Sequence, residues 1–246
     1  MRPIVFPTIA PIAAGATQVC ASQSGTANTA LLLNGVGAVQ PYGVPIAGGG
    51  QNQGGLSNPG SGYRQPGSFY QPYVQLDTQR QIVIASVGND SGVTFAITGT
   101  SSTGAVVSET LTGANAGSAT SANTYYTITS IVPSGNTAST VTVGTNGVAG
   151  SVPLPVPLGL FAVTLQCVAI GTVSYSITQT DDDPNVSNPD TACVWTPVVA
   201  AMTNATSTQV AAATTIARAY RVTVNSNTPP GGVKVTVVPQ QGITSA

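Results

Sequence analysis

Short segments in which apolar and polar side chains alternate fill the chain from about residue 76 onwards. In 93–100, Val93, Phe95 and Ile97 alternate with Thr94, Ala96 and Thr98, which is the period of a strand with one buried face. Similar segments, separated by turn residues, recur at 80–87, 102–113, 124–133 and 139–145, and then at 161–170, 172–180, 217–226 and 232–240. This spacing predicts an all-β protein of the sandwich kind.

Two stretches depart from the alternation and divide the chain. The start is rich in Gly, Pro, Gln and Asn and has no regular period, as in a linker or extended arm. In 150–160, prolines occur at every second position, which favours an extended hinge over a paired strand. We therefore expect an extended N-terminal arm (1–75), a first β-sandwich domain (76–149), a Pro-rich hinge (150–160) and a second β-sandwich domain (161–246), each sandwich Ig-like or jelly-roll-like.

An arm without a core of its own must be held by something else. Its short apolar groups are the candidate anchors, and we expect them to dock on neighbouring subunits by strand addition or in pockets. These interface residues are Ile4, Val5, Phe6, Ile9, Leu31, Leu32 and Leu33.

The low charge changes the picture of the surface. Charged residues make up 5% of the chain, against about 25% in a typical domain. A surface with so few charges, and with Lys234 as its single lysine, is poorly protected against association. We expect other subunits to cover much of it, in a homo-oligomer or larger assembly. The alternative is a secreted protein adapted to a concentrated or surface-bound setting.

The charges and the apolar segments of the chain argue against nucleic acid and membranes as partners. A net charge of −1 with scattered bases argues against nucleic acid, whose binding needs clustered Lys or Arg. No stretch reaches the roughly 18 apolar residues of a membrane span. Pro3, Pro7 and Pro11 interrupt the apolar start, so we expect neither a membrane protein nor export through this segment.

The chain contains no histidine. This excludes Ser–His–Asp and Cys–His catalysis and removes the commonest zinc ligand. A glycosidase-like carboxylate pair would have to come from seven acidic residues, four of them in one loop. We expect a protein that is not an enzyme and has no cofactor.

That loop, "DDDPNVSNPD" at 181–190, has two interpretations. Asp181, Asp182, Asp183, Asn185 and Asp190, with Asn188, could supply oxygen ligands for a weak Ca²⁺ site, although their spacing matches no EF-hand. Alternatively it is a solvated inter-strand loop in which Pro sets turns and Asp and Asn cap them.

Two charges in the first strand set need an explanation. Arg80 is in phase with Ile82 and Ile84, and Glu109 is in phase with Val107 and Leu111. If both point inward, they form a structural ion pair or hydrogen-bonded network at the edge of the core. The alternative places both at strand ends in water.

Trp195 and the cysteines leave further alternatives open. Trp195 could mark a sugar-binding platform, but a lone Trp at a strand end is more often core or interface. Cys20, Cys167 and Cys193 are expected to be free, small apolar residues, and a Cys167–Cys193 bridge is not decided by spacing.

Two stretches resemble β modules of tailed-bacteriophage structural proteins. The first is "RQIVIASVGNDSGVTFAITGTSSTGAVVSETLTG", which continues to "TYYTITSIVPSGNTASTVTVGT" (80–145). The second (161–240) comprises "FAVTLQCVAIGTVSYSITQTDDDPN" and later "ATTIARAYRVTVNS" and "GGVKVTVVPQ". The resemblance implies a virion protein assembled in the host cytoplasm, with the major capsid protein or other virion subunits as partners. A capsid decoration or cement protein is the main expectation. A head–tail connector or tail component, or a receptor- or glycan-binding fibre module, are the alternatives.

Overall fold

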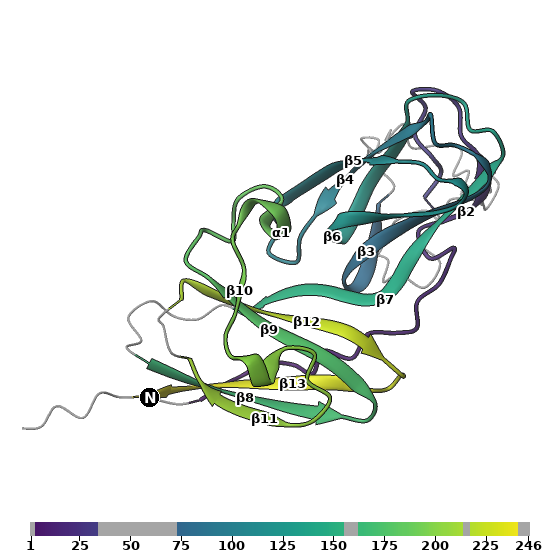
Figure 1. Cartoon of the computed structure of the whole chain (residues 1–246). Helices are drawn as coiled ribbons and strands as arrows, with labels where there is room; N and C mark the ends of the chain where they lie inside the picture. Colours follow the sequence, from purple (N-terminus) through teal and green to yellow (C-terminus); the bar gives the residue numbers. More distant parts are fainter. Residues whose placement is uncertain (1–2, 34–72, 155–161, 214–216, 241–246) are drawn as a thin grey trace, which may run out of the picture.

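The computed structural model describes residues 3–33, 73–154, 162–213 and 217–240, and in this part of the chain the protein is built almost entirely of strands (Figure 1). All of the paired strands run antiparallel, which confirms the all-β prediction. No helix in the described ranges is long and apolar enough to cross a membrane. The elements are β1 (Ile4–Val5), β2 (Cys20–Ser24), β3 (Val74–Asn89), β4 (Thr94–Thr100), β5 (Val106–Thr112), β6 (Asn115–Pro133), β7 (Thr140–Leu154), β8 (Ala162–Ile170), β9 (Val173–Thr180), α1 (Pro189–Ala192), β10 (Thr196–Pro197), the 3-10 turn η1 (Ala200–Met202), β11 (Gln209–Ala212), β12 (Ala219–Asn227) and β13 (Gly232–Gln240).

Each segment predicted from alternation contains a strand. The main differences are in length: β3 begins at Val74 and β6 at Asn115, ahead of the predicted 80 and 124. The short strands β1, β2, β10 and β11 were not predicted. With two to five residues each, they are too short to display a period.

Strand β7 belongs to both halves of the described structure. It pairs with β3 at Val141–Ala149 and with β12 at Ala149–Leu154, so one sheet runs in the order β10-β9-β12-β7-β3-β6-β4-β5. The expectation of an unpaired hinge over 150–160 is therefore wrong for its first part, since Pro153 lies opposite Arg221 in this ladder. Among the described residues, β7 pairs beyond Ala149 with β12 alone, and such an edge position tolerates a proline. Residues 155–160 of the predicted hinge lie outside the described residues.

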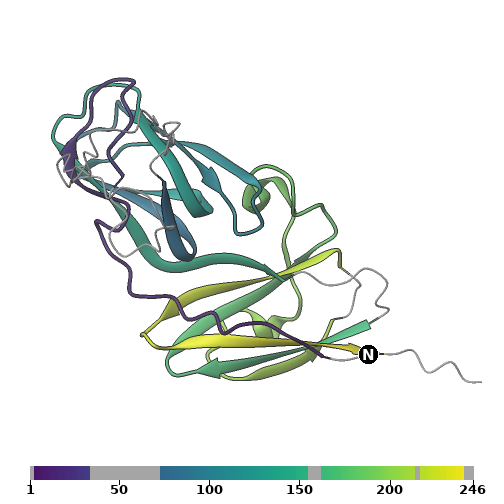
Figure 2. The same cartoon turned by 180° about the vertical axis from the view of Figure 1, so that it is seen from behind.

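The buried apolar side chains form two clusters: the first core, built on β3, β4, β6 and β7, and the second core, built on β8, β9, β12 and β13. The second core lies between two sheets: β8 and β13 supply Leu165 and Val235, and β9 and β12 supply Ile177 and Val222 from the facing sheet. The first core is formed by alternate residues of β3, β4, β6 and β7, among them Ile84 and Phe95, all but inaccessible to solvent. Figure 2 shows the two regions from behind, with β7 passing from one to the other. The domain boundaries at 76–149 and 161–246 stay a prediction.

Candidate functional site: a strap and a loop that join two cores

The first described segment, residues 3–33, crosses both cores, and we call it the strap. At its start β1 pairs with β13 in the register Ile4↔Val237 and Val5↔Thr236, and Ile9 forms an isolated bridge with Val233. Further along, β2 pairs with β7 on the first core. The strap therefore adds strands to two sheet edges of its own chain, as the dark trace in Figure 2 shows.

In this structure the arm's candidate anchors lie on or beside their own chain, and their docking on neighbouring subunits stays a prediction. Ile4, Phe6 and Ile9 pack against the second core, and Leu31 and Leu33 are buried in the first. Val5 and Leu32 are exposed. The reason is that β13 and β7 present free edges within reach of the strap, and an edge is the natural acceptor for an extended segment. Residues 34–72 of the predicted arm lie outside the described residues.

The centre of the strap is held by a buried ion pair. Arg80, with no exposed surface, donates from Nε to Asp77 Oδ1 and from Nη2 to Asp77 Oδ2, both at 2.7 Å. The Arg80 Nη2 also donates to the carbonyl of Ile12 at 2.6 Å, and the Ile12 N–H donates to Asp77 Oδ2 at 2.9 Å. Both backbone groups of Ile12 are thus bound by one ion pair, which we call the Arg80 network.

The expected pairing of Arg80 with Glu109 is wrong, although Arg80 does point inward. Asp77 was missed because residues three apart on a regular strand face opposite sides, whereas β3 shifts register between Gln75 and Arg80. Glu109 is half-buried and accepts instead from the N–H groups of Ala122 and Asn123 and from the Asn123 amide. Its carboxylate satisfies backbone donors of β6 where β6 has no ladder partner on that side.

Two glycines let the strap lie directly on the sheets. A methyl group on Gly144 of β7 would overlap the Gly15 carbonyl oxygen and the Ala16 backbone, and one on Gly232 of β13 would meet the carbonyl oxygen of Ile9. Because the displaced atoms would be backbone, neither clash can be relieved by turning a side chain. Close backbone approach is a reason for glycine at a strand position.

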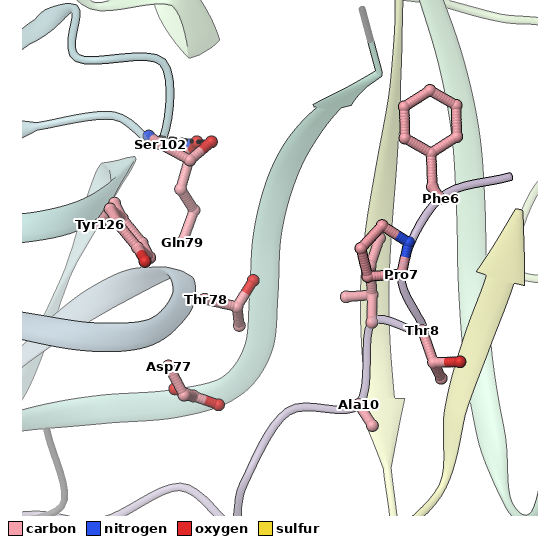
Figure 3. A pocket seen from close by; sticks show the side chains of 10 residues that line it. Phe6, Pro7, Thr8, Ala10, Asp77, Thr78, Gln79, Ser102 and Tyr126 are labelled. Carbon is pink, nitrogen blue, oxygen red and sulfur yellow. Dashed lines mark hydrogen bonds between the residues drawn. The ribbon is translucent and has the colours of Figure 1, made fainter. Parts of the chain in front are cut away.

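A cleft of about 440 Å³ lies between the strap and the first core. Figure 3 shows Phe6, Pro7 and Ala10 on one side and Asp77, Gln79 and Tyr126 on the other. Most of the polar side chains on the first-core wall have partners. Gln79 donates to Thr124 and accepts from Ser102, Tyr126 accepts from Gln75, and Asp77 belongs to the Arg80 network. The cleft therefore offers an apolar wall and a neutral wall, with no paired nucleophile and base.

The acidic loop, residues 181–195, does not gather its acids at one point. Asp182 accepts from the N–H of Val194, and Asp183 accepts from Asn185 and pairs with Arg218 at 2.8 Å. The Asn185 N–H and then Arg218 hold the pKa of the exposed Asp183 below its usual value. Within the described ranges no three His, Cys, Asp or Glu side chains are placed to hold a metal ion. The arrangement therefore favours the capped-loop interpretation, and a weak Ca²⁺ site at Asp181, Asp182, Asp183, Asn185 and Asp190 stays a prediction.

Asp190 instead faces the first core. Its Oδ2 accepts from the N–H and hydroxyl of Thr124 on β6, and its Oδ1 accepts from Arg221 Nη1 of β12 at 3.0 Å. Arg221 lies over the Trp195 ring at 4.1 Å from the centroid, and the Trp195 indole donates to the Pro189 carbonyl. We call this the Asp190 network. It explains Trp195 as a packing residue of the loop, since its polar edge and one ring face have partners in the chain.

The same loop covers part of a sheet edge. The N–H of Asn188 donates to the Val106 carbonyl, and the Asn188 side chain accepts from the Ser108 N–H. Asn188 thus occupies the first backbone groups of edge strand β5, and covering an edge suppresses unwanted pairing with other chains. Together with the Asp190 network, it joins the loop between β9 and β10 to β5 and β6.

All three cysteines are free and buried, so the Cys167–Cys193 bridge is not present. Burial raises the pKa of the Cys167 thiol to about 12 and raises that of Cys20 and Cys193 in the same direction. Thiols held in the protonated form are poor nucleophiles. Cys167 and Cys20 fill space in the second and first cores, as small apolar residues do, and Cys193 is buried within the acidic loop.

The charged side chains of the described residues serve mainly internal contacts. Three ion pairs join Asp77 to Arg80, Asp183 to Arg218, and Asp190 to Arg221. Asp90 is fully buried and Glu109 binds backbone N–H groups. Of the other charged residues in the described ranges, Asp182 accepts from the Val194 N–H, and Asp181 and Lys234 are exposed.

A scan against protein-family models and a search of curated proteins found no match for this sequence.

Proposed function

We propose that this chain is a non-enzymatic structural subunit of a tailed-bacteriophage particle, in which a strap is followed by two β-sandwich domains. The observation that carries the proposal is the use of charge. Charged residues on a surface favour solubility. Here two of the ion pairs, Asp77–Arg80 and Asp190–Arg221, lie instead where the strap and the acidic loop contact the cores. What is left outside is a surface of Thr, Ser, Val and Ala, which suits coverage by neighbouring subunits.

The internal networks fit such a role. The Asp190 network joins β6 to β12, the Arg80 network binds the strap to β3, and β7 links the two cores by a continuous backbone. A subunit that spans a seam between neighbours must transmit force between its own halves. A joint held by a shared sheet and two hydrogen-bonded networks is suited to that task.

Within the particle, a capsid decoration or cement protein is the role we favour, with the major capsid protein as partner. Covering neutral apolar surface would stabilise the shell by roughly 25 cal/mol per Å², before the costs of association. A head–tail connector or tail component is the alternative. A glycan-binding fibre module is less well supported, because Trp195 has partners in Pro189 and Arg221 of its own chain and most polar side chains on the first-core wall of the cleft are engaged.

Deleting the gene from the phage that carries it tests the proposal. We expect particles that assemble but release DNA at lower temperature or lower ionic strength, with resistance restored by adding the purified chain. Heads without tails would favour the connector role. Particles with unchanged stability and infectivity would contradict a structural role.

A further inference from the structure

We propose that the strap also binds between chains: in an assembly, residues 3–33 of one copy occupy the sheet edges of a second copy of this chain. The interaction surface is the part of β13, Arg80 and β7 on which the strap lies, and we call it the groove. Its occupant is the strap of a second, identical chain. The inference rests on the proposed function only in that an assembly brings copies to high local concentration.

The contacts that hold the strap do not depend on which chain supplies it. On β13 they are backbone hydrogen bonds from Phe6 N–H to Val235 O at 3.0 Å, from Ile9 N–H to Val233 O at 2.9 Å and from Val233 N–H to Ile9 O at 3.0 Å. On the first core, Val19 N–H donates to Val143 O at 3.0 Å. Such strand addition is a common mode of binding between separate chains.

The receiving groove is built by residues that follow the strap. Gly144 and Gly232 provide the close approach, and Asp77 and Arg80 provide the groups that bind Ile12. The Asn227 amide donates to the Pro11 carbonyl at 2.8 Å. The strap contributes mainly backbone groups to these polar contacts, so a strap from another copy would satisfy the same donors and acceptors.

The connection between the strap and β3 is long enough for exchange. Residues 34–72 separate Leu33 from Tyr73, and by length alone such a segment can span up to about 130 Å. Because exchange keeps every strap contact, the two arrangements differ little in contact energy, and concentration decides between them.

A pair of cysteines on the outer face of the β1–β13 ladder tests this directly. Val5 and Thr236 face each other, Val5 is 55% exposed and Thr236 is half-buried, and neither belongs to a core cluster. Facing residues of antiparallel strands lie at a Cα separation that a disulfide can bridge. The full-length Val5→Cys chain with a long tag and the full-length Thr236→Cys chain with a short tag are co-expressed, oxidised and separated by size without reductant.

Exchange predicts a mixed disulfide between the two tagged chains in the oligomeric fraction, involving roughly half of the Val5→Cys chains if straps and grooves pair at random. The matched control pairs Val5→Cys with Val210→Cys, which is similarly exposed at 61% but lies on β11, away from β13; it should give no such product. The wild-type pair controls for the buried native thiols.

The inference is overturned if the single variants form no mixed disulfide while the double variant Val5→Cys/Thr236→Cys closes within one chain. A protein that stays monomeric at all concentrations, with only that internal bridge, overturns it equally. Mixed disulfides in a chain that is absent from phage particles would support the exchange and contradict the proposed function. A particle protein whose strap closes only internally would do the reverse.

Discussion

Arg80 and Asp77 bind the same strap residue from two sides: the guanidinium donates to the Ile12 carbonyl and the carboxylate accepts from the Ile12 N–H. The Arg80 guanidinium also donates two hydrogen bonds of 2.7 Å to the Asp77 carboxylate. A fully buried arginine is costly unless it is paired. Here the pairing simultaneously fixes where the strap crosses from one core to the other.

Replacing Asp77 by Asn should destabilise the protein, because it leaves the Arg80 charge buried without its partner. We expect a loss of about 3 kcal/mol, the lower end for a broken buried pair, since the Asp77 side chain is 19% exposed. Urea unfolding measures it. The control is Asp183→Asn, which breaks the exposed pair with Arg218 and should change the urea midpoint much less. Equal losses in the two variants would show that the Arg80 network does not contribute as described.

Gly144→Ala should displace the strap, because the new methyl group would overlap the backbone of Gly15 and Ala16. We expect a lower unfolding midpoint and faster proteolytic cleavage within residues 3–33. Gly147→Ala is the matched control on the same strand, since its methyl group would meet nothing within 4 Å. Similar cleavage rates in the two variants would contradict the close seating of the strap on β7.

Asp190→Ala should weaken the joint made by the acidic loop. It removes the acceptor for Thr124 and the partner of Arg221, whose side chain is 16% exposed, so we expect a loss of about 2–4 kcal/mol. Asp181→Ala, at an exposed acid of the same loop, should change stability by less than about 0.5 kcal/mol. Thermal and urea unfolding compare the two.

Calcium should have no effect on these midpoints. The loop carboxylates are turned to Val194, Asn185, Arg218 and Arg221, away from a common centre. A rise in the melting temperature on adding Ca²⁺, absent in Asp181→Ala, would revive the metal-site interpretation.

Stability should fall on the alkaline side. Burial raises the pKa of Cys167 and of Tyr175 to about 12 each, whereas an unfolded thiol ionises near 8.5 and an unfolded tyrosine near 10. The unfolded chain therefore releases protons first. The contribution of these two groups to the free energy of unfolding is complete below about pH 8. It is lost as the pH rises toward their folded pKa values of about 12.

The variant Cys167→Val distinguishes the effect of Cys167 ionisation on stability from the effects of other groups that ionise at alkaline pH. Valine fits the strand and does not titrate, so the decline in the urea midpoint between about pH 9 and pH 12 should become shallower. An unchanged slope would show that Cys167 ionisation is not part of the decline.

The sequence predicts the strands well because each long strand buries one face and so carries a period of two. It could not predict the partner of Arg80, since the register shift in β3 brings Asp77 to the same side. It also could not show that the strap binds its own chain, because Ile4 and Phe6 would suit any free edge. Asp190 was proposed as a Ca²⁺ ligand because it lies in a segment rich in acidic residues, whereas in the fold its carboxylate contacts Thr124 and Arg221. Pairings between distant segments have no local signature.

The central claim is that this chain is a subunit of a tailed-phage particle, and its copy number in purified particles tests it most directly. Quantitative mass spectrometry would give the ratio of this chain to the major capsid protein. We predict a ratio near one or a simple fraction set by the capsid lattice. A ratio equal to that of the portal ring would move the protein to the connector or tail, and its absence from particles would contradict the account.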